Sequence, residues 1–433
     1  MKKRLSKVVA VVLTCAMVLP LTACNGIGLG AQIQSDDLMK DIQKNTETNI
    51  EDDSCGELPP NPEFAVADFS VQLFQESMEE GKNTLISPLS VLVALSMTAN
   101  GAKGNTKEQM ESVFGTWITT LNRYLRDYME NLPQDEKYKL QLANSIWLTN
   151  DERFTVNQKF LQTNANYYGA DIYKAAFDKS TLKDINLWVE QKTDGMIKNI
   201  LNEIPKDALM YLINALTFDA KWQKTYEEDQ VREATFTTED GKKQKVELMY
   251  SDESAYLEDE QASGFIKYYA GRKYAFVALL PKEGVSVADY VRGMSGDELY
   301  TLIANPQSIH VDAAIPVFET EYDVLMNDFL IQMGMTDAFD GEKADFTGLG
   351  TSSAGNIFIG RVIHKTYITV GPQGTRAGAA TVVEMRDESA GYYEETKTVH
   401  LDRPFVYMLI DCENKQPFFM GTMMSVEKEC GLE

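Results

Sequence analysis

A segment near the carboxyl end, in which charged and uncharged positions alternate, most constrains what this chain can fold into. Every second residue from Thr375 to Met385 is uncharged, while Arg376 and Glu384 fall on the opposite parity. The uncharged positions are Thr375, Ala377, Ala379, Thr381, Val383 and Met385. This period of two is typical of a strand with one buried face. Four glycines between positions 371 and 391 favour a loop instead. The sequence therefore predicts a segment that suits both a loop and a buried strand.

The first residues have the pattern of an export signal. Lys2, Lys3, Arg4 and Lys7 precede an apolar run that ends in Leu-Thr-Ala-Cys at Cys24. This ending resembles a bacterial lipoprotein box, in which the chain is cleaved before a lipidated cysteine. We expect residues 1–23 to be a lipoprotein signal peptide and Cys24 to carry the anchor. A plain signal peptide and an uncleaved transmembrane anchor are the alternatives.

The chain beyond the signal divides into a linker and one large domain. Residues 24–61 are polar, acidic and contain glycine, which is typical of a flexible linker holding a domain away from a membrane. Residues 62–433 show no comparable break and no repeat. We therefore expect one domain outside the cytoplasm, lipid-anchored to the bacterial membrane or surface.

The charge balance excludes some partners. The chain carries 41 basic and 65 acidic residues, and loss of the signal removes four basic residues and no acidic ones. So acidic a surface repels nucleic acids and anionic lipids. We expect no nucleic-acid partner and a monomeric chain.

The cysteines do not predict a metal site or a disulfide scaffold. Cys15 leaves with the signal and Cys24 is the expected lipid site, so Cys55, Cys412 and Cys430 remain. An odd number without metal-like spacing argues against both kinds of site. A bond between Cys55 and Cys430 stays open, with Cys412 as a buried thiol in an apolar strand.

Periodicity predicts helices early in the domain and strands late. Asn61-Pro62 and Ser87-Pro88 each have the pattern of a helix cap followed by proline. Further helices are predicted over 184–201 and 322–335, and strands over 210–222, 273–281, 308–318 and 403–413. This order favours the α+β class over alternating βαβ units.

Familiar catalytic and cofactor motifs are absent from the sequence. His310, His364 and His400 do not form a metal-binding pattern, and no nucleophile elbow, phosphate loop or dinucleotide fingerprint occurs. Ser87 with His364 as its base is conceivable, but a helix cap and a core histidine are favoured for these two residues. We expect neither an enzyme nor a metal or cofactor.

Six ordered motifs resemble the serpin family of protease inhibitors, and together they cover about residues 63–427. The motifs are NTLISPLSVLVALSMTANGAKGNTKEQM, INLWVEQKTDGMIKNIL, LINALTFDAKW, LMNDFLIQMGMTDAFDGEKADFTGL, VIHKTYITVGPQGTRAGAAT and LDRPFVYMLIDCENKQPFFMG. The resemblance implies helices packed around a large mixed β-sheet, smaller sheets and an exposed reactive-centre loop, here about residues 371–400.

The resemblance also implies a mechanism. A protease cleaves the loop and forms an acyl-enzyme, and the loop then inserts into the main sheet, so that the attached protease is displaced and distorted. Small uncharged residues on the inward parity suit such an insertion, because a buried charge costs several kcal/mol. The implied hinge comprises Gly374, Thr375, Arg376, Ala377, Gly378, Ala379, Ala380 and Thr381.

Three residues depart from the family pattern at this hinge. Pro372-Gln373 stands where an acidic pair is usual, and Arg376 replaces the usual acidic residue after the hinge threonine. Proline removes a backbone donor at the strand end, which affects how insertion begins. The alternation itself is intact.

Matching positions imply a cluster that controls opening of the sheet. It comprises Ser87, Pro88, Ser90, Asn214 and His364, with Asn83 nearby and Trp222 where the loop enters. A plain role in core packing is the alternative for each residue.

A count from Gly374 predicts cleavage between Glu388 and Ser389, and hence a glutamate-preferring target. A count back from Arg403 moves the bond toward Tyr393. Arg386 would suit a trypsin-like target, Asp387 an aspartate-specific one, and Met385 or Val383 an elastase-like one.

We expect an inhibitor of extracellular serine endopeptidases, or of cysteine endopeptidases, with the target protease as a covalent partner. A non-inhibitory serpin that acts as a binding or chaperone protein is the alternative. Charged or bulky residues on the inward parity would have favoured it.

Overall fold

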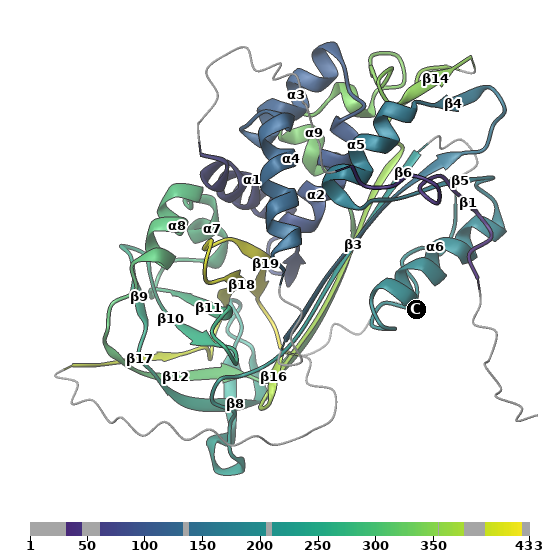
Figure 1. Ribbon diagram of the computed structural model, residues 1–433. Helices are drawn as coiled ribbons and strands as arrows, with labels where there is room; N and C mark the ends of the chain where they lie inside the picture. The colour runs from purple at the N-terminus through teal and green to yellow at the C-terminus, as the bar shows by residue number, and fades with distance from the viewer. Residues whose placement is uncertain are drawn as a thin grey trace, which may run out of the picture. The chain divides into compact units, whose positions relative to one another are not determined.

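The computed structural model describes residues 32–45, 61–132, 138–204, 210–353, 355–375 and 395–426. The chain divides into two units, Met1–Gln32 and Ile33–Glu433. All elements named below belong to the second unit, where helices and four sheets of the described residues form an α+β fold (Figure 1). The predicted fold class is confirmed.

The largest sheet is mixed and has the strand order β1-β5-β3-β6-β16-β15-β13. Its strands are β1 (Asp36–Asp37), β5 (Asp171–Ala175), β3 (Tyr138–Thr149), β6 (Met210–Lys221), β16 (Gly374–Thr375), β15 (Arg361–Gly371) and β13 (Phe318–Leu325). β6 runs antiparallel to β3 and parallel to β15. The predicted strand over 210–222 is thus the central strand of this sheet.

Three smaller sheets complete the strand content of the described residues. The second sheet contains β2 (Thr84–Ile86), β19 (Pro417–Met423), β18 (Phe405–Asp411), β11 (Tyr274–Pro281), β10 (Ala262–Tyr268) and β9 (Tyr256–Glu258) in that spatial order. The third contains β17 (Thr396–His400), β12 (His310–Pro316), β8 (Lys243–Glu253) and β7 (Val231–Thr237). β14 (Gly350–Ser352) pairs with β4 (Phe154–Val156).

Helices pack mainly on one face of the largest sheet and beside the second sheet (Figure 1). They are α1 (Pro62–Ser77), α2 (Pro88–Ala99), α3 (Gly104–Phe114), α4 (Ile118–Glu130), α5 (Gln158–Tyr168), α6 (Lys179–Lys192), α7 (Val287–Arg292), α8 (Gly296–Ala304) and α9 (Asn327–Gln332), with 3-10 turns η1 (Glu228–Gln230) and η2 (Asp337–Phe339). In the described part of the chain, none of the helices is long and apolar enough to cross a membrane.

Separate cores cover the two faces of the largest sheet. Every residue of α2 is buried, and this helix packs against β3 and β6 within the main core. On the opposite face, Ile185, Trp188 and Val189 of α6 cover a smaller core with residues from β3, β6 and β15. A strand inserted between β6 and β15 would therefore have buried surroundings on both faces.

The helix predicted over 184–201 ends early. α6 stops at Lys192, because the following Asp194 and Gly195 have positive φ values of 49° and 74°. Ile200 and Leu201 still reach the smaller core, and the Asn186 side chain accepts hydrogen bonds from both of their N–H groups. Their apolar spacing reflects packing of an irregular segment instead of a helix.

The helix predicted over 322–335 is wrong in its first half. Tyr322–Leu325 belong to the edge strand β13, and only α9 is helical. Tyr322 and Val324 are partly buried while Asp323 is exposed, so the segment follows a period of two. Tyr322 and Leu325, three residues apart, could also share one face of a helix, and pairing with β15 decides the outcome.

The expected flexible linker over 24–61 contains an ordered part. Residues 33–45 form a strap, in which β1 pairs with β5 at the edge of the largest sheet. Oδ2 of Asp184 accepts hydrogen bonds from the N–H groups of Gln34 and Ser35 at 3.0 and 2.7 Å. The strap's Leu38, Met39 and Ile42 pack against the main core. These apolar contacts explain why the segment joins the domain.

The prediction that Cys412 is a buried thiol within a strand needs a small correction. Cys412 lies immediately after β18 and is only partly buried, instead of lying within the strand. Burial raises the pKa of this thiol to about 12, so it is protonated and unreactive at neutral pH. Cys24, Cys55 and Cys430 lie outside the described residues.

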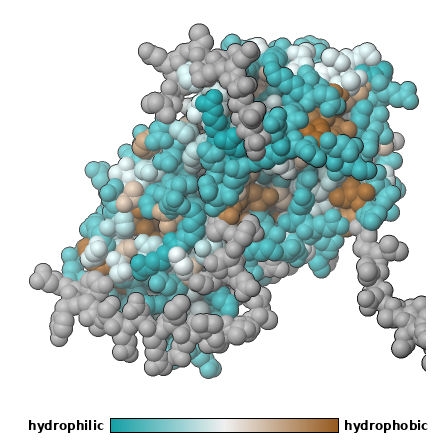
Figure 2. Space-filling model, in the orientation of Figure 1, coloured by the Kyte–Doolittle hydropathy of each residue, from teal (hydrophilic) through white to brown (hydrophobic). Residues whose placement is uncertain are grey.

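The face of the molecule seen in Figure 2 is mainly hydrophilic. The hydrophobic patches on this face are separate from one another. Among the large apolar side chains of the described residues, Phe64 and Leu325 are the exposed ones, at 36% and 44%.

Candidate functional site

The site lies between β6 and β15, where a short third strand begins to separate them. Residues 211–216 of β6 pair in parallel with residues 361–366 of β15. At the other end of these strands, β16 lies between them: Thr375 pairs with Ala220 of β6 and with Val370 of β15. The largest sheet is therefore closed along one half and already holds two residues of a further strand in the other.

Gly374 is required where β16 begins. Its φ is +152°, and a Cβ atom at this position would lie 2.0 Å from the carbonyl oxygen of Ala220. A side chain cannot occupy that space without moving the strand. Gly371, on the other side of the same turn, has open space around its Cα.

Trp222 and Tyr226 hold the turn that precedes β16. The backbone N–H of Trp222 donates to the carbonyl of Gln373 at 3.0 Å, and its indole Nε1 donates to the carbonyl of Gly371 at 2.9 Å. The N–H of Tyr226 donates to the carbonyl of Pro372 at 3.0 Å. Three consecutive carbonyls of the turn are thus fixed to one short segment after β6.

The side chain of Thr375 is buried beneath this turn. It is 1% exposed, and its hydroxyl shares a hydrogen bond with the hydroxyl of Tyr269. The Tyr269 ring stacks on Trp222 with a centroid distance of 4.4 Å and an interplanar angle of 10°. Burial raises the pKa of Tyr269, so the phenol stays neutral. A threonine fits here because its side chain is small and its hydroxyl can pair with the Tyr269 hydroxyl, beside the stacked rings of Tyr269 and Trp222.

A buried ion pair supports that wall, and the sequence analysis missed it. Lys267 is 2% exposed, and its Nζ lies 2.7 Å from Oε1 of Glu253. The same Nζ lies 4.4 Å from the ring centroid of Tyr226 and 5.5 Å from that of Trp222. Within these distances a cation is attracted to aromatic faces, so Lys267 positions both residues that hold the turn.

A second cluster lies beneath the closed half of β6 and β15. Asn144 of β3, Asn214 of β6 and His364 of β15 stand opposite one another in the strand register. His364 is fully buried, and its Nδ1 is hydrogen-bonded to Oδ1 of Asn214. Oγ of Ser90 donates to Oδ1 of Asn144 at 3.4 Å. Asn144 is a further member that the sequence analysis missed, because an asparagine in a strand carries no distinct signal.

The bonds of His364 fix its protonation state. The backbone N–H of Ser87 donates to Nε2 at 3.0 Å, so Nε2 is unprotonated and Nδ1 carries the proton given to Asn214. Burial lowers the pKa of His364 to about 3. Oγ of Ser87 accepts from the N–H of Ser90 at 3.3 Å, as a helix cap. His364 therefore faces the backbone of Ser87 and not its hydroxyl, which does not favour a nucleophile and base.

The other predicted members lie at the edge of this cluster. Pro88 is the first residue of α2. Asn83 binds elsewhere: its Oδ1 accepts from the N–H groups of Met424 and Ser425, and its Nδ2 donates to the carbonyl of Ser425. Asn83 thus fastens the chain after β19.

The remaining predicted site residues lie outside the part of the chain that the structure describes. The predicted hinge residues and reactive-bond candidates outside the described residues are Arg376, Ala377, Gly378, Ala379, Ala380, Thr381, Arg386, Asp387, Glu388, Ser389 and Tyr393. The described chain resumes before β17, which pairs in parallel with β12. No group of three or more possible metal-binding side chains occurs in the described part.

Comparisons with known proteins agree on one family. A family model described as serpin (serine protease inhibitor) matches residues 64–426. An uncharacterised serpin-like protein of Methanosarcina acetivorans is 30% identical, with 85% of this chain and 88% of the relative covered. The crystal structure of a thermophilic serpin, tengpin, in its native state is 46% identical with a TM-score of 0.83, covering 91% of this chain and 100% of that one. Its latent-state structure is 44% identical with a TM-score of 0.75, covering 86% and 100%.

Proposed function

The chain belongs to the serpin family, and we propose that it is a suicide-type inhibitor of an extracellular serine endopeptidase. The family is described by its inhibition of serine proteases. In this proposal the protease hydroxyl adds to the carbonyl carbon of Glu388, the bond to Ser389 breaks, and the new amine leaves with a proton. The ester that remains is trapped if the freed loop enters the sheet before water hydrolyses it.

The register of β16 is the observation that carries this proposal. β16 is antiparallel to β6, so each further residue along the loop would stand opposite the preceding residue of β6. Continuation would place Ala377 opposite Phe218 and Ala379 opposite Leu216, whose side chains belong to the main core. The uncharged alternate residues of the loop would thus face that core, where burial of a charge is costly.

Continuation of β16 in this register also suits Arg376, the first loop residue whose side chain would point to the other face of the sheet. Arg376 would stand opposite Asp219, which is partly exposed. The basic residue that departs from the usual family pattern would then lie beside a carboxylate at the surface. Its charge is compatible with the inserted strand.

Insertion of the loop would bring a hydrogen-bond acceptor to a buried amide that has none in the described structure. In the described structure, Nδ2 of Asn214 is buried without a hydrogen-bond partner. By the registers of β16 with β6 and with β15, Thr381 would stand between Asn214 and His364 when the loop is inserted. Its hydroxyl could accept the unused N–H of Asn214, and a buried unpaired amide costs about 1–3 kcal/mol. Insertion would also separate Asn214 from His364, so the Thr381 hydroxyl would have to replace their present hydrogen bond as well as accept from Nδ2.

A panel of proteases with different specificities tests the proposal. Incubation with a glutamate-preferring, a trypsin-like and an elastase-like protease should give, for one of them, a denaturant-resistant band of the summed mass. Mass spectrometry of the released carboxyl-terminal peptide would locate the bond. Clean cleavage by all members without a covalent band would refute inhibition and support a binding or chaperone role.

We also propose that Cys24 anchors the protein outside the cytoplasm. The support is the Leu-Thr-Ala-Cys ending after a basic and apolar segment. A labelled fatty acid should be incorporated into the expressed chain but not into a Cys24→Ser variant. Equal labelling of both chains would refute this assignment.

A further inference from the structure

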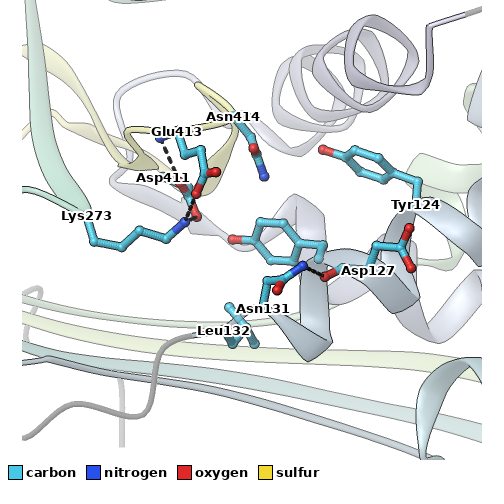
Figure 3. Close-up of a pocket in the computed structure, with 9 residues that line it drawn as sticks. Tyr124, Asp127, Asn131, Leu132, Lys273, Asp411, Glu413 and Asn414 are labelled. Atoms are coloured by element: carbon cyan, nitrogen blue, oxygen red, sulfur yellow. Dashed lines mark hydrogen bonds and ion pairs between the residues drawn. The ribbon is translucent and has the colours of Figure 1, made fainter.

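A cavity away from the loop site lies between α4 and the turn that joins β18 to β19. It has a volume of about 430 Å³, within the range of roughly 300–1,000 Å³ that small-molecule sites occupy. Figure 3 shows Tyr124 and Asp127 of α4 on one side and Lys273, Asp411 and Glu413 on the other. The hydroxyl of Tyr124 points across the space toward Asn414.

The wall from α4 carries unused polar atoms. Tyr128 is 7% exposed, and its hydroxyl has no hydrogen-bond partner within the described chain. The hydroxyl of Tyr124 is likewise buried without a partner there. Burial is the main cause that raises the pKa of both phenols, and Asp411 raises both further, so they are neutral. Two buried oxygens at one cavity are an unusual cost, because buried hydroxyls are normally paired.

The opposite wall has excess negative charge. Asp411 is 1% exposed, and Nζ of Lys273 lies 3.0 Å from its Oδ2 and 2.8 Å from Oε2 of Glu413. One lysine thus serves two carboxylates. On the α4 side, the carboxylate of Asp127 is already paired with Arg126 at 3.1 Å. An anionic ligand would meet repulsion here.

A metal ion also fits this cavity poorly. The described residues contain no group of three or more side chains placed to hold one. The acceptor oxygens instead line a wide space and are interleaved with aromatic rings. Such a lining suits a ligand that has several N–H donors and a cation able to lie against an aromatic face.

We propose that this cavity binds an organic ammonium ion, a primary amine or short diamine. Its N–H groups would donate to the phenol oxygens of Tyr124 and Tyr128, and its charge would offset the excess carboxylate of Asp411 and Glu413. The ligand would thereby satisfy the buried oxygens that lack partners. This inference does not depend on the proposed inhibition.

Binding of 1,4-diaminobutane, with 1,4-butanediol as the uncharged probe of similar length, tests the proposal on the full chain. Calorimetry should show saturable binding of one diamine and none of the diol. The diamine should also raise the thermal midpoint, because it binds the folded state. Equal binding of the diol would overturn the ammonium assignment, and binding of neither probe would overturn the site.

Matched variants distinguish the cavity from general attraction to an acidic surface. Tyr128→Phe removes only an unpartnered hydroxyl, so it should fold normally and weaken diamine binding about tenfold. Asp297→Asn removes one charge from another acidic cavity, lined by Glu258, Asp259 and Glu298, and should leave binding unchanged. The opposite result, with Asp297→Asn weakening binding and Tyr128→Phe without effect, would place the diamine at the other cavity and overturn the proposal.

Discussion

Nε2 of His364 accepts the backbone N–H of Ser87 at 3.0 Å, so this buried ring joins α2 to the largest sheet only in its neutral form. Protonation would place a second hydrogen on Nε2, facing the N–H of Ser87. The junction between α2 and the largest sheet is therefore sensitive to acid.

This bond predicts a specific pH dependence. The folded pKa of His364 is about 3 and the ordinary value is 6.5, so the unfolded chain binds the extra proton first. The stabilising contribution of His364 is fully present above about pH 6.5 and is lost at about 1.4 kcal/mol per pH unit as the pH falls toward 3. Urea unfolding of the uncut chain and of His364→Gln should show a stability difference that narrows below pH 6.5. A difference that is constant with pH would contradict this account.

The turn before β16 predicts a contrast between two glycines. Gly374→Ala should displace β16, because its Cβ would meet the carbonyl of Ala220 at 2.0 Å. We expect a loss of about 1–3 kcal/mol in the free energy of unfolding and faster amide exchange at Trp222. Gly371→Ala is the control, because no atom lies within 4 Å of the added Cβ. Equal effects of the two changes would show that this close approach does not matter.

The buried pair of Lys267 and Glu253 predicts a non-additive result. Lys267→Met should leave the Glu253 carboxylate without its counterion and cost about 3–5 kcal/mol of stability. The double variant Lys267→Met/Glu253→Gln should recover part of this loss. Lys245→Met is a matched control, because the pair of Lys245 and Glu233 is 84% and 73% exposed. Chemical unfolding of the natural chain, Lys267→Met, Glu253→Gln and the double variant measures the coupling, and simple additivity of the two single changes would argue against the pair.

Thr381 predicts an effect confined to the cleaved state. If the loop inserts in the register of β16, Thr381→Val leaves Nδ2 of Asn214 unpaired and costs about 1–3 kcal/mol in the cut form only. Thr381→Ser retains a hydroxyl and should behave like the natural chain. Thermal midpoints before and after cleavage of the loop provide the measurement. A loss of the same size before cleavage would refute this register.

Asp184 predicts how firmly the strap is held. Asp184→Asn retains the shape but weakens an acceptor of three hydrogen bonds from Gln34 and Ser35. We expect faster amide exchange over residues 34–38, with the exchange of β18 unchanged as an internal control. If the strap exchanged at the same rate in both chains, its apolar contacts alone would hold it.

The sequence predicted the elements whose local pattern and burial agree. The caps at Asn61 and Ser87 and the strands at 210–222 and 273–281 are confirmed, because proline after a cap and runs of β-branched or aromatic residues act locally. Tyr322–Leu325 differed because partner strands select between two periods that a short segment fits equally.

Sequence patterns did not predict side chains that lie in an environment unusual for their type. Lys267 lies in a strand of the second sheet, where a lysine normally indicates an exposed position, and only the carboxylate of Glu253 from another sheet makes its burial tolerable. The order of the strap was not predicted for a related reason. Leu38, Met39 and Ile42 are scattered in a polar segment, and their burial depends on a surface formed by distant residues.

The strap has a consequence for how separate copies of this chain meet. An unpaired outer strand is a template for edge-to-edge aggregation. Asp36 and Asp37 of β1 occupy part of that template on β5. At the other outer strand, β13, the exposed side chains include Glu319, Glu321 and Asp323, so two identical edges would repel each other. The largest sheet thus discourages pairing with strands of a neighbouring molecule at both of its margins.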